Sequence, residues 1–301
     1  MNREIQFEKA TGDLSRKCIV VKYGGAAMKS SALRNCVIRD IVNLRESGAD
    51  VVIVHGGGPE LTTLQEQLGI ETMFVDGLRF TDAQTIDAAL MALCGKVNKD
   101  IVRLLEKEGQ RAAGLSGIDG SIICCRKQEI PDLGFVGEIT KIRKELLHIL
   151  LIGGIMPIIS TVGIGEDGLA YNINADTAAG RIAAALGADC FITLSDVPGV
   201  LQDTSDPMSL IVEMDEDEAE ELIRSGIITG GMIPKIRGVC DAVRRGAKSA
   251  SIIDGRVPHS LLSALAERAA SERGDTLESI ANFVGTTVIG RKRDENEQLG
   301  Y

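Results

Sequence analysis

The sequence predicts an α/β fold in which helices cover both faces of a mostly parallel open sheet, a three-layer αβα sandwich. Short aliphatic runs alternate with amphipathic helical patterns along the whole chain. The runs are rich in β-branched residues, too short to be helices and continuously apolar, which is typical of strands buried on both faces. Hydrophobic residues make up 44% of the chain and aromatic residues only 3%, so we expect an aliphatic core.

Five of the runs are the clearest strands, and apolar residues at helical spacing mark three helices between them. The strands are expected at residues 17–23, 49–55, 155–160, 189–195 and 247–253. The helical faces are expected to be Leu33, Val37, Ile41 and Leu44, then Leu61, Leu64 and Leu68, then Ala178, Ile182 and Leu186. A chain of 301 residues is long enough for two lobes that share one sheet, and we place their boundary near residue 189.

Two segments interrupt this pattern and are expected to be β-hairpins. One spans residues 71–82 with Asp76-Gly77 as its turn, and the other is the region 134–140, after Pro131. Ligands of open α/β sheets bind in the crevice outside the carboxyl ends of the strands. Hairpins inserted over that edge would therefore form a substrate lid.

Composition excludes several classes of function. The net charge of −10 and the scarcity of aromatic residues argue against a nucleic-acid partner. No apolar stretch approaches the length of a membrane span, and the first seventeen residues lack the apolar core of a signal peptide, so we expect a cytoplasmic protein. Seven cysteines without a C-x-x-C motif and three histidines indicate buried thiols and not a disulfide framework or a zinc site.

Three glycine-rich turns are expected to follow strands and to bind anions. They are Lys22-Tyr23-Gly24-Gly25, His55-Gly56-Gly57-Gly58-Pro59 and Thr229-Gly230-Gly231-Met232-Ile233-Pro234-Lys235. Glycines at such junctions expose backbone N–H groups, and the start of a helix adds a positive partial charge. Neither the P-loop motif nor the G-x-G-x-x-G motif is present, which argues against both common nucleotide-binding folds.

The segment from Tyr171 to Thr177 is a further candidate site. Asn174 is expected to cap a helix that begins at Ala175, with Asp176 in its first turn. Capping alone accounts for Asn174 and Asp176 but leaves Asn172 without a role. His55, at the end of its strand, is interpreted as a packed residue and not as an acid–base group.

Eight segments form an ordered series from about Lys17 to beyond Lys235. They are KYGGAAM, VHGGGPEL, GLRFTD, GKVNKDIV, GFVGEI, YNINADTAAG, LSDVPGVL and GGMIPKI. In this order the series resembles the amino acid kinase family. The GLRFTD and YNINADTAAG segments resemble the N-acetylglutamate kinases within it. The resemblance implies the amino acid kinase fold and transfer of a phosphoryl group from ATP to the side-chain carboxylate of N-acetyl-L-glutamate, the second step of arginine biosynthesis.

The resemblance also implies roles for the candidate residues. Lys22 and Lys235 would contact the transferring phosphoryl group from two sides, and Asp176 would orient both lysines. The residues implied to bind the substrate are Gly57, Gly58, Arg79, Asn172 and Asn174, with Arg79 pairing with the α-carboxylate. Those implied to bind nucleotide or phosphate are Gly24, Gly25, Ser195, Asp196, Gly230, Gly231 and Met232. Magnesium would be held mainly by the phosphates of ATP, with a water bridge to Asp176 and no direct protein ligand.

By the same resemblance, residues 1–189 would bind the amino-acid substrate and form the dimer, and residues 190–301 would bind ATP. A homodimer is expected and a hexamer is the alternative, because residues 1–17 are short and broken by Gly12 where arginine-regulated relatives have a longer helix. Inhibition by arginine is only weakly indicated, because the 271–283 segment departs from the family's arginine-site pattern. N-acetyl-aminoadipate and a carrier-linked acidic amino acid remain alternative acceptors. A non-catalytic nucleotide or amino-acid sensor is the alternative from another class.

Overall fold

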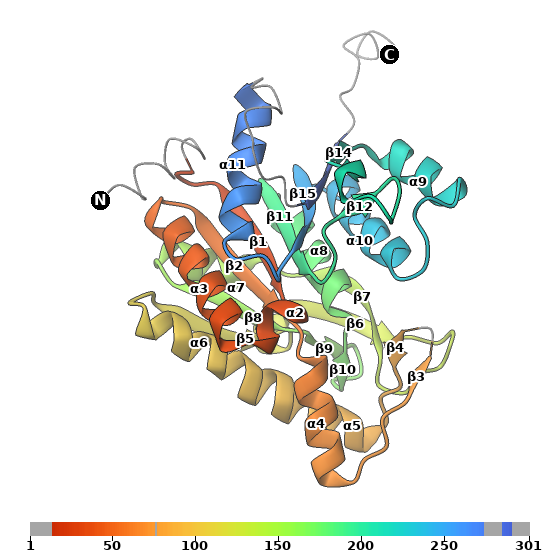
Figure 1. Cartoon of the computed structure of the whole chain (residues 1–301). Helices are drawn as coiled ribbons and strands as arrows, with labels where there is room; N and C mark the ends of the chain where they lie inside the picture. The colour runs from red at the N-terminus through yellow and green to blue at the C-terminus, as the bar shows by residue number, and fades with distance from the viewer. Residues whose placement is uncertain (1–13, 76, 274–284, 291–301) are drawn as a thin grey trace, which may run out of the picture.

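The computed structural model describes residues 14–75, 77–273 and 285–290. Its centre is an eight-stranded sheet in the order β14-β16-β15-β11-β1-β2-β8-β5 (Figure 1). All neighbouring strands in it are parallel except β15 and β16. Its strands are β1 (Cys18–Tyr23), β2 (Asp50–His55), β5 (Ala112–Ser116), β8 (Met156–Ser160), β11 (Cys190–Ser195), β14 (Glu213–Met214), β15 (Ser249–Asp254) and β16 (Gly285–Ile289).

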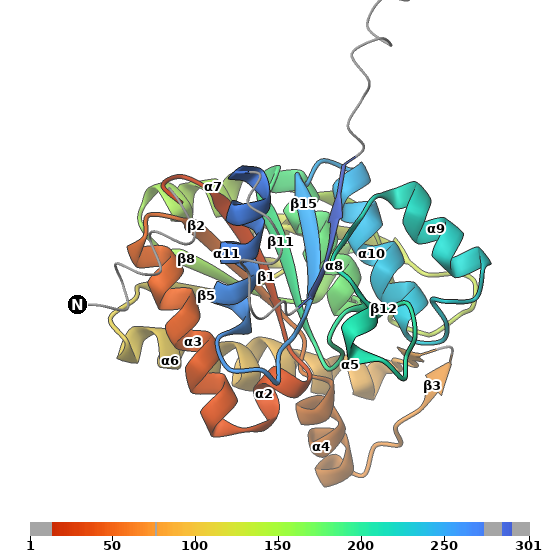
Figure 2. The same ribbon diagram turned by 45° about the horizontal axis from the view of Figure 1, so that its top comes forward.

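Helices cover both faces of this sheet, as Figures 1 and 2 show. The helices are α2 (Ala26–Lys29), α3 (Ser31–Glu46), α4 (Gly58–Leu68), α5 (Ala83–Ala89), α6 (Asn98–Lys107), α7 (Glu145–Ile152), α8 (Ala175–Leu186), α9 (Glu216–Arg224), α10 (Met232–Arg244) and α11 (Ser260–Arg273). The π-helical segment η1 (Leu90–Val97) joins α5 to α6, and η2 (Asp119–Ser121) and η3 (Pro207–Ser209) are short 3-10 turns.

Alternate residues of each central strand enter two different cores. Ile19 and Val21 of β1 pack with α3, α6 and α11, whereas Val20 packs with α8 and α10. Because successive side chains of a strand point to opposite faces, an apolar run on each strand supplies both cores. The three-layer αβα prediction is therefore confirmed, and the five strands predicted from the sequence are five of the eight in this sheet.

A second, four-stranded sheet in the order β10-β9-β6-β7 lies beside the main one. It consists of β6 (Ile123–Lys127), β7 (Gly137–Ile142), β9 (Val162–Gly165) and β10 (Ala170–Asn172). The β-hairpin predicted around residues 134–140 is present, as the antiparallel pair of β6 and β7. Residues 134–140 form the loop end and the first part of β7, and β6, the other strand of the hairpin, was not predicted.

The other predicted hairpin is present. It pairs β3 (Phe74–Val75) with β4 (Leu78–Arg79) in antiparallel fashion, and Gly77 has a positive φ of 81° at the turn. Asp76, the other predicted turn residue, lies outside the described residues, as do residues 1–13 and 274–284, on which the expectations about assembly and arginine depended. One further pair, β12 (Val200–Leu201) and β13 (Leu210–Ile211), is antiparallel.

None of the helices within the described residues is long and apolar enough to cross a membrane.

Candidate active site

The carboxyl end of β1 and the start of α8 bring two predicted residues together. Lys22 is nearly buried, and its Nζ lies 2.8 Å from Oδ1 of Asp176. Asn174 caps α8, since its side chain accepts hydrogen bonds from the backbone N–H groups of Asp176 and Thr177, both at 3.0 Å. The cap fixes the first turn of the helix, and the first turn holds Asp176 against the lysine.

The charge of Asp176 is stabilised by both predicted lysines. Burial opposes ionisation of this carboxyl group, but the charge and hydrogen bond of Lys22 and the charge of Lys235 outweigh it. The pKa of Asp176 is therefore held below its usual range. Lys235 lies half-buried in the first turns of α10, the helix that packs against α8 and β15.

The first two glycine turns meet beside Lys22. A Cβ atom built on Gly24 would lie 3.9 Å from the backbone nitrogen of Gly56 and 3.9 Å from Cε of Lys22. Gly25 has a φ of 60°, a conformation that favours glycine, and no atom would meet a Cβ placed on it. The two glycine turns therefore lie next to each other and to the Lys22 side chain, which places glycine backbone beside an ammonium group as in anion-binding turns.

The third glycine turn does not follow a strand, contrary to the prediction. Gly230 and Gly231 lie between the helices α9 and α10, and both are exposed, with no atom within 4 Å of a Cβ atom placed on either glycine. Met232 begins α10 and is half-buried. The segment before it forms a turn after α9, in which the buried Ile228 packs into the core and its backbone N–H donates to the carbonyl oxygen of Leu222 at 3.0 Å.

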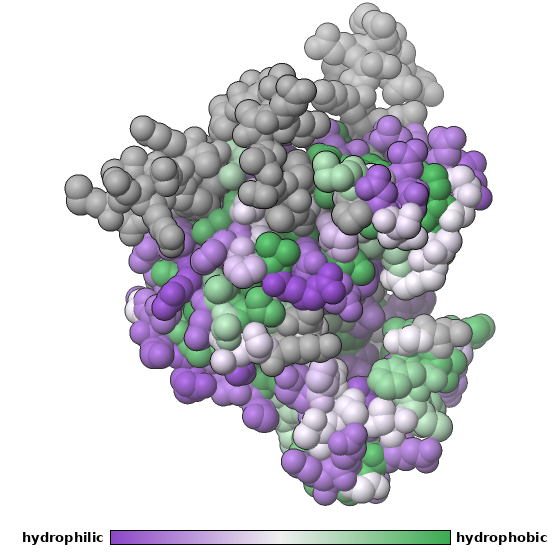
Figure 3. Space-filling model, in the orientation of Figure 1, coloured by the Kyte–Doolittle hydropathy of each residue, from purple (hydrophilic) through white to green (hydrophobic). Residues whose placement is uncertain are grey.

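A pocket of about 170 Å³ adjoins the second glycine turn. Figure 3 shows the surface hollowed next to the hydrophobic patch over the β3–β4 hairpin, where Met73, Phe74 and Val75 are exposed. The predicted substrate residues that line the pocket are Gly57, Gly58, Arg79, Asn172 and Asn174. Thr161, which is 1% exposed, also lines it and was not predicted, because a single threonine at the end of a strand carries no sequence signal.

Arg79 occupies a fixed position at the side of this pocket. Its Nη2 donates to the carbonyl oxygen of Gly58 at 3.1 Å and to Oγ1 of Thr62 at 2.8 Å, and its Nη1 donates to Oε1 of Gln65. The guanidinium carbon lies 4.7 Å from the centre of the Phe74 ring, a cation–π contact. Asn172, across the pocket, donates to Oγ1 of Thr81 at 3.2 Å.

Ser195 and Asp196 lie at the carboxyl end of β11, the neighbour of β1 on the side away from the pocket. Ser195 is buried and its hydroxyl group donates to Oδ1 of Asp196 at 3.4 Å, while Asp196 itself is exposed. The structure thus places the predicted substrate residues in one pocket and these two on the other half of the sheet, with Lys22 and Asp176 between them.

His55 is fully buried, as interpreted from the sequence. Its Nδ1 lies 2.7 Å from the carbonyl oxygen of Gly56, and its Nε2 lies 3.0 Å from Nδ2 of Asn98. The amide nitrogen can only donate, so Nε2 accepts and Nδ1 carries the proton. Burial lowers the pKa of His55 to about 4.

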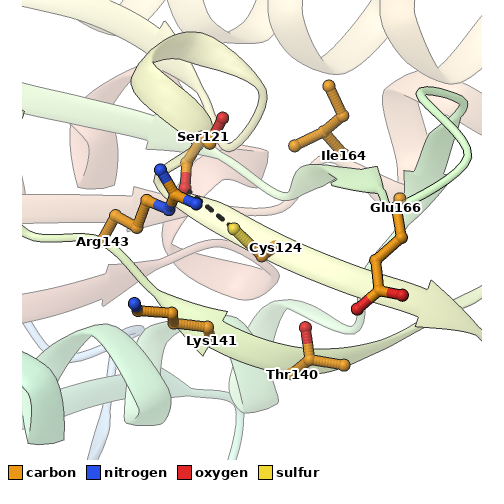
Figure 4. Close-up of a pocket in the computed structure, with 8 residues that line it drawn as sticks. Ser121, Cys124, Thr140, Lys141, Arg143, Ile164 and Glu166 are labelled. Atoms are coloured by element: carbon orange, nitrogen blue, oxygen red, sulfur yellow. Dashed lines mark hydrogen bonds between the residues drawn. The ribbon is translucent and has the colours of Figure 1, made fainter.

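A second hollow, of about 300 Å³, lies on the four-stranded sheet (Figure 4). Lys141 and Arg143 lie on one side of it and Glu166 on the other, and the Cys124 thiol donates to the carbonyl oxygen of Ser121 at 3.4 Å. The predicted site residues do not line this hollow. Within the described part of the chain, no group of three or more His, Cys, Asp or Glu side chains is arranged to hold a metal ion.

The model of the amino acid kinase family matches residues 17–254. The chain belongs to the amino acid kinase family. Acetylglutamate kinase from a Nostoc species is 50% identical to it over 246 residues, which is 82% of this chain and 83% of the relative. Acetylglutamate kinase from Clostridioides difficile is 47% identical over 249 residues, 83% of this chain and 87% of the relative.

Solved structures share the amino acid kinase fold. A Streptococcus mutans protein matches with a TM-score of 0.68 at 29% identity and covers 78% of this chain and 94% of its own. N-acetylglutamate synthase from Neisseria gonorrhoeae matches with a TM-score of 0.78 at 20% identity. The match covers 97% of this chain and 64% of the synthase chain. Carbamate kinase from Giardia lamblia matches with a TM-score of 0.65 at 16% identity. The match covers 92% of this chain and 99% of the carbamate kinase chain. The last two likenesses concern the fold alone.

Proposed function

We propose that this protein transfers the γ-phosphoryl group of ATP to the side-chain carboxylate of N-acetyl-L-glutamate, in arginine biosynthesis. The observation that carries the proposal is the Lys22–Asp176 pair, which lies where two glycine turns meet beside the pocket. Near-50% identity to acetylglutamate kinases over more than four-fifths of the chain supports the choice of substrate.

The reaction needs positioning and charge stabilisation more than covalent help. A carboxylate oxygen of the acceptor attacks the γ-phosphorus, the bond to the β–γ bridging oxygen breaks, and ADP leaves as N-acetylglutamyl 5-phosphate forms. Lys22 and Lys235 neutralise charge on the phosphoryl group from the two halves of the sheet, and Asp176 holds both lysines in place. A general base is unnecessary, because a carboxylate is already ionised near neutral pH.

The pocket is proposed to hold the acceptor. Arg79 pairs with its α-carboxylate, and Asn172 and Asn174 provide hydrogen bonds to its remaining polar groups. The backbone N–H groups of Gly57 and Gly58 receive the attacking carboxylate. On the opposite side of Lys22, the γ-phosphoryl group is received by Gly24 and Gly25. The remaining nucleotide contacts are assigned to Ser195, Asp196, Gly230, Gly231 and Met232.

ATP is proposed to bring Mg²⁺ with it. The charged groups here are the ammonium groups of Lys22 and Lys235, which fit phosphate oxygens and repel a free cation, and Asp176, a single carboxylate that already pairs with Lys22. This donor set fits a magnesium ion carried by the phosphates, with at most a water bridge to Asp176. When bound, the ion neutralises charge on the β- and γ-oxygens.

We also propose that residues 1–189 bind the acceptor and form a homodimer, and that residues 190–301 bind ATP. The sheet supports this division, since β1, β2, β8 and β5 come from the first segment and β11, β15, β16 and β14 from the second. A hexamer is the alternative assembly, and the cytoplasm is the expected compartment on the sequence grounds given above. Light scattering of the purified protein distinguishes the dimer from the hexamer.

The test is an ADP-release assay with ATP and Mg²⁺ that offers N-acetylglutamate, N-acetyl-aminoadipate, glutamate and aspartate in parallel. We expect the highest kcat/KM on N-acetylglutamate and its loss in Lys22→Ala. A higher value on another acceptor would contradict the proposed substrate. ATP binding without ADP release on any acceptor would show a sensor instead of an enzyme.

A further inference from the structure

Gln65 is a buried amide on α4 that connects three elements around the pocket. Its side chain is completely buried. Its Nε2 donates to Oγ1 of Thr85 at 3.1 Å and to the carbonyl oxygen of Glu71 at 3.4 Å. Its Oε1 accepts from Oγ1 of Thr72 at 3.1 Å and from Nη1 of Arg79. Figure 1 shows α4 and α5 next to each other, and the chain that leaves α4 leads into the β3–β4 hairpin.

These contacts determine which way the amide faces. Both donors and both lone pairs of the Gln65 side chain are used. A flipped amide would turn its NH₂ group toward the guanidinium of Arg79, donor against donor. The oxygen of Gln65 is therefore directed at Arg79, and the buried surroundings prevent it from turning away.

The three hydrogen-bond partners of the Arg79 guanidinium are all electrically neutral. Its guanidinium donates to an amide oxygen, a hydroxyl oxygen and a backbone carbonyl oxygen. Such partners orient the group but do not neutralise its charge. A carboxylate at position 65 would have held Arg79 equally well in geometry, but it would also have competed with an anionic ligand.

We propose that Gln65 is a positioning residue for acceptor binding, which fixes the Arg79 guanidinium toward the pocket and leaves its positive charge available to the α-carboxylate of the acceptor. This inference rests on the proposed function. It assigns selectivity for α-carboxylates to a neutral, buried network and not to Arg79 alone.

If Gln65 acts through Arg79, its replacement should weaken the binding only of acceptors that carry an α-carboxylate. We therefore compare N-acetylglutamate with 4-acetamidobutyrate, which has the same reacting carboxylate and acetamido group but no α-carboxylate. The variants are Gln65→Met, which keeps the length and removes the hydrogen bonds, and Gln65→Glu, which keeps the shape and adds a charge. Gln67→Met is the matched control, since Gln67 is exposed on the same helix.

We expect both Gln65 variants to raise KM for N-acetylglutamate by about ten-fold or more, because a hydrogen bond to a charged group is lost or its charge is neutralised. The KM for ATP and the kcat/KM for 4-acetamidobutyrate should stay close to those of the wild type. In an Arg79→Ala background, Gln65→Met should cause no further loss on N-acetylglutamate.

Two results would overturn the role of Gln65. One is an equal loss on both acceptors, and the other is a loss that persists in the Arg79→Ala background. Either would mean that Gln65 only supports the fold, and thermal melting of each variant measures that contribution separately. A wild-type protein inactive on N-acetylglutamate would instead overturn the proposed function, and this inference with it.

Discussion

The Lys22–Asp176 pair combines strong mutual attraction with a partly buried position. Lys22 is nearly buried and is directed at the crevice by β1, which lies between β2 and β11. An ammonium group in such a place needs a nearby carboxylate, because an unpaired buried charge is strongly unfavourable. Asp176 therefore fixes the position of Lys22 before ATP arrives, and electrostatic groups positioned in advance contribute most to a transfer reaction.

At the residue scale we predict that Asp176→Asn keeps the shape of the site but lowers kcat strongly. The substitution removes the charge that balances Lys22 and Lys235, and we expect kcat to fall by about 10² or more. KM for the acceptor should change less, since Arg79 and the pocket are untouched. Steady-state kinetics measure both constants, with the exposed Asp203→Asn as control. An unchanged kcat in Asp176→Asn would remove this carboxylate from the mechanism.

The site residues that could be predicted from the sequence are those that belong to a recognisable short motif. Lys22 directly precedes two glycines at a strand end, and Asn174 and Asp176 mark the start of a helix, so each could be found within a few residues of chain. Gln65 and Thr161 could not be found in this way. Their roles depend on which segments pack together, and Gln65 meets Arg79 only because α4 and the hairpin lie side by side.

At the element scale, the start of α4 depends on a glycine. Gly57 has a φ of 155° and a ψ of 37°, and a Cβ atom there would lie 2.8 Å from Cδ2 of Leu93 and 3.0 Å from Cγ2 of Val97. The close approach of η1 therefore leaves no room for a side chain.

We predict that Gly57→Ala destabilises the protein by about 2 kcal/mol or more, because it combines backbone strain with overpacking. Gly58→Ala is the matched control, since it begins α4 with no atom nearer than 4.0 Å to the added carbon. That variant should change the free energy of unfolding by less than about 1 kcal/mol. Urea unfolding measures the free energy of unfolding of both variants. Equal losses of stability in Gly57→Ala and Gly58→Ala would show that the close approach of η1 does not restrict position 57.

Element prediction succeeded where hydrophobic runs are continuous and failed where a strand carries exposed charges or glycines. The five apolar runs became five of the eight strands of the main sheet. The strand β6 contains the exposed Arg126 and Lys127, and β9 contains two glycines, so neither presents an apolar run. Consequently β6 was not predicted as the first strand of the hairpin, although the hairpin region that contains the start of β7 was.

On the scale of the whole molecule, one continuous sheet supports the site. The neighbours of β1 are β2, which leads into the second glycine turn, and β11, which leads into Ser195 and Asp196. The residues proposed to bind the acceptor and the nucleotide thus follow the two strands that flank β1 in a single buried sheet. His55 stands at the end of β2 within that framework, so its protonation state affects the stability of the protein as a whole.

We predict that His55 makes the folded state sensitive to acid. Its pKa is lowered by burial to about 4 in the folded protein, against an ordinary value of 6.5, so the unfolded chain binds a proton more readily. The contribution to stability is therefore complete above pH 6.5 and is lost progressively as pH falls toward 4. Between pH 7 and pH 5 this loss amounts to about 2 kcal/mol.

Urea unfolding of the wild type, His55→Gln and His148→Gln at these two pH values tests this contribution. His55→Gln should be less stable at pH 7, because it disturbs the hydrogen bonds to Gly56 and Asn98, yet it should lose about 2 kcal/mol less than the wild type on acidification. His148 is exposed, so its replacement should leave the pH dependence unchanged. If His55→Gln and the wild type lose stability in parallel, then His55 is not the group that binds the proton on unfolding, and the acid sensitivity resides in the carboxylates.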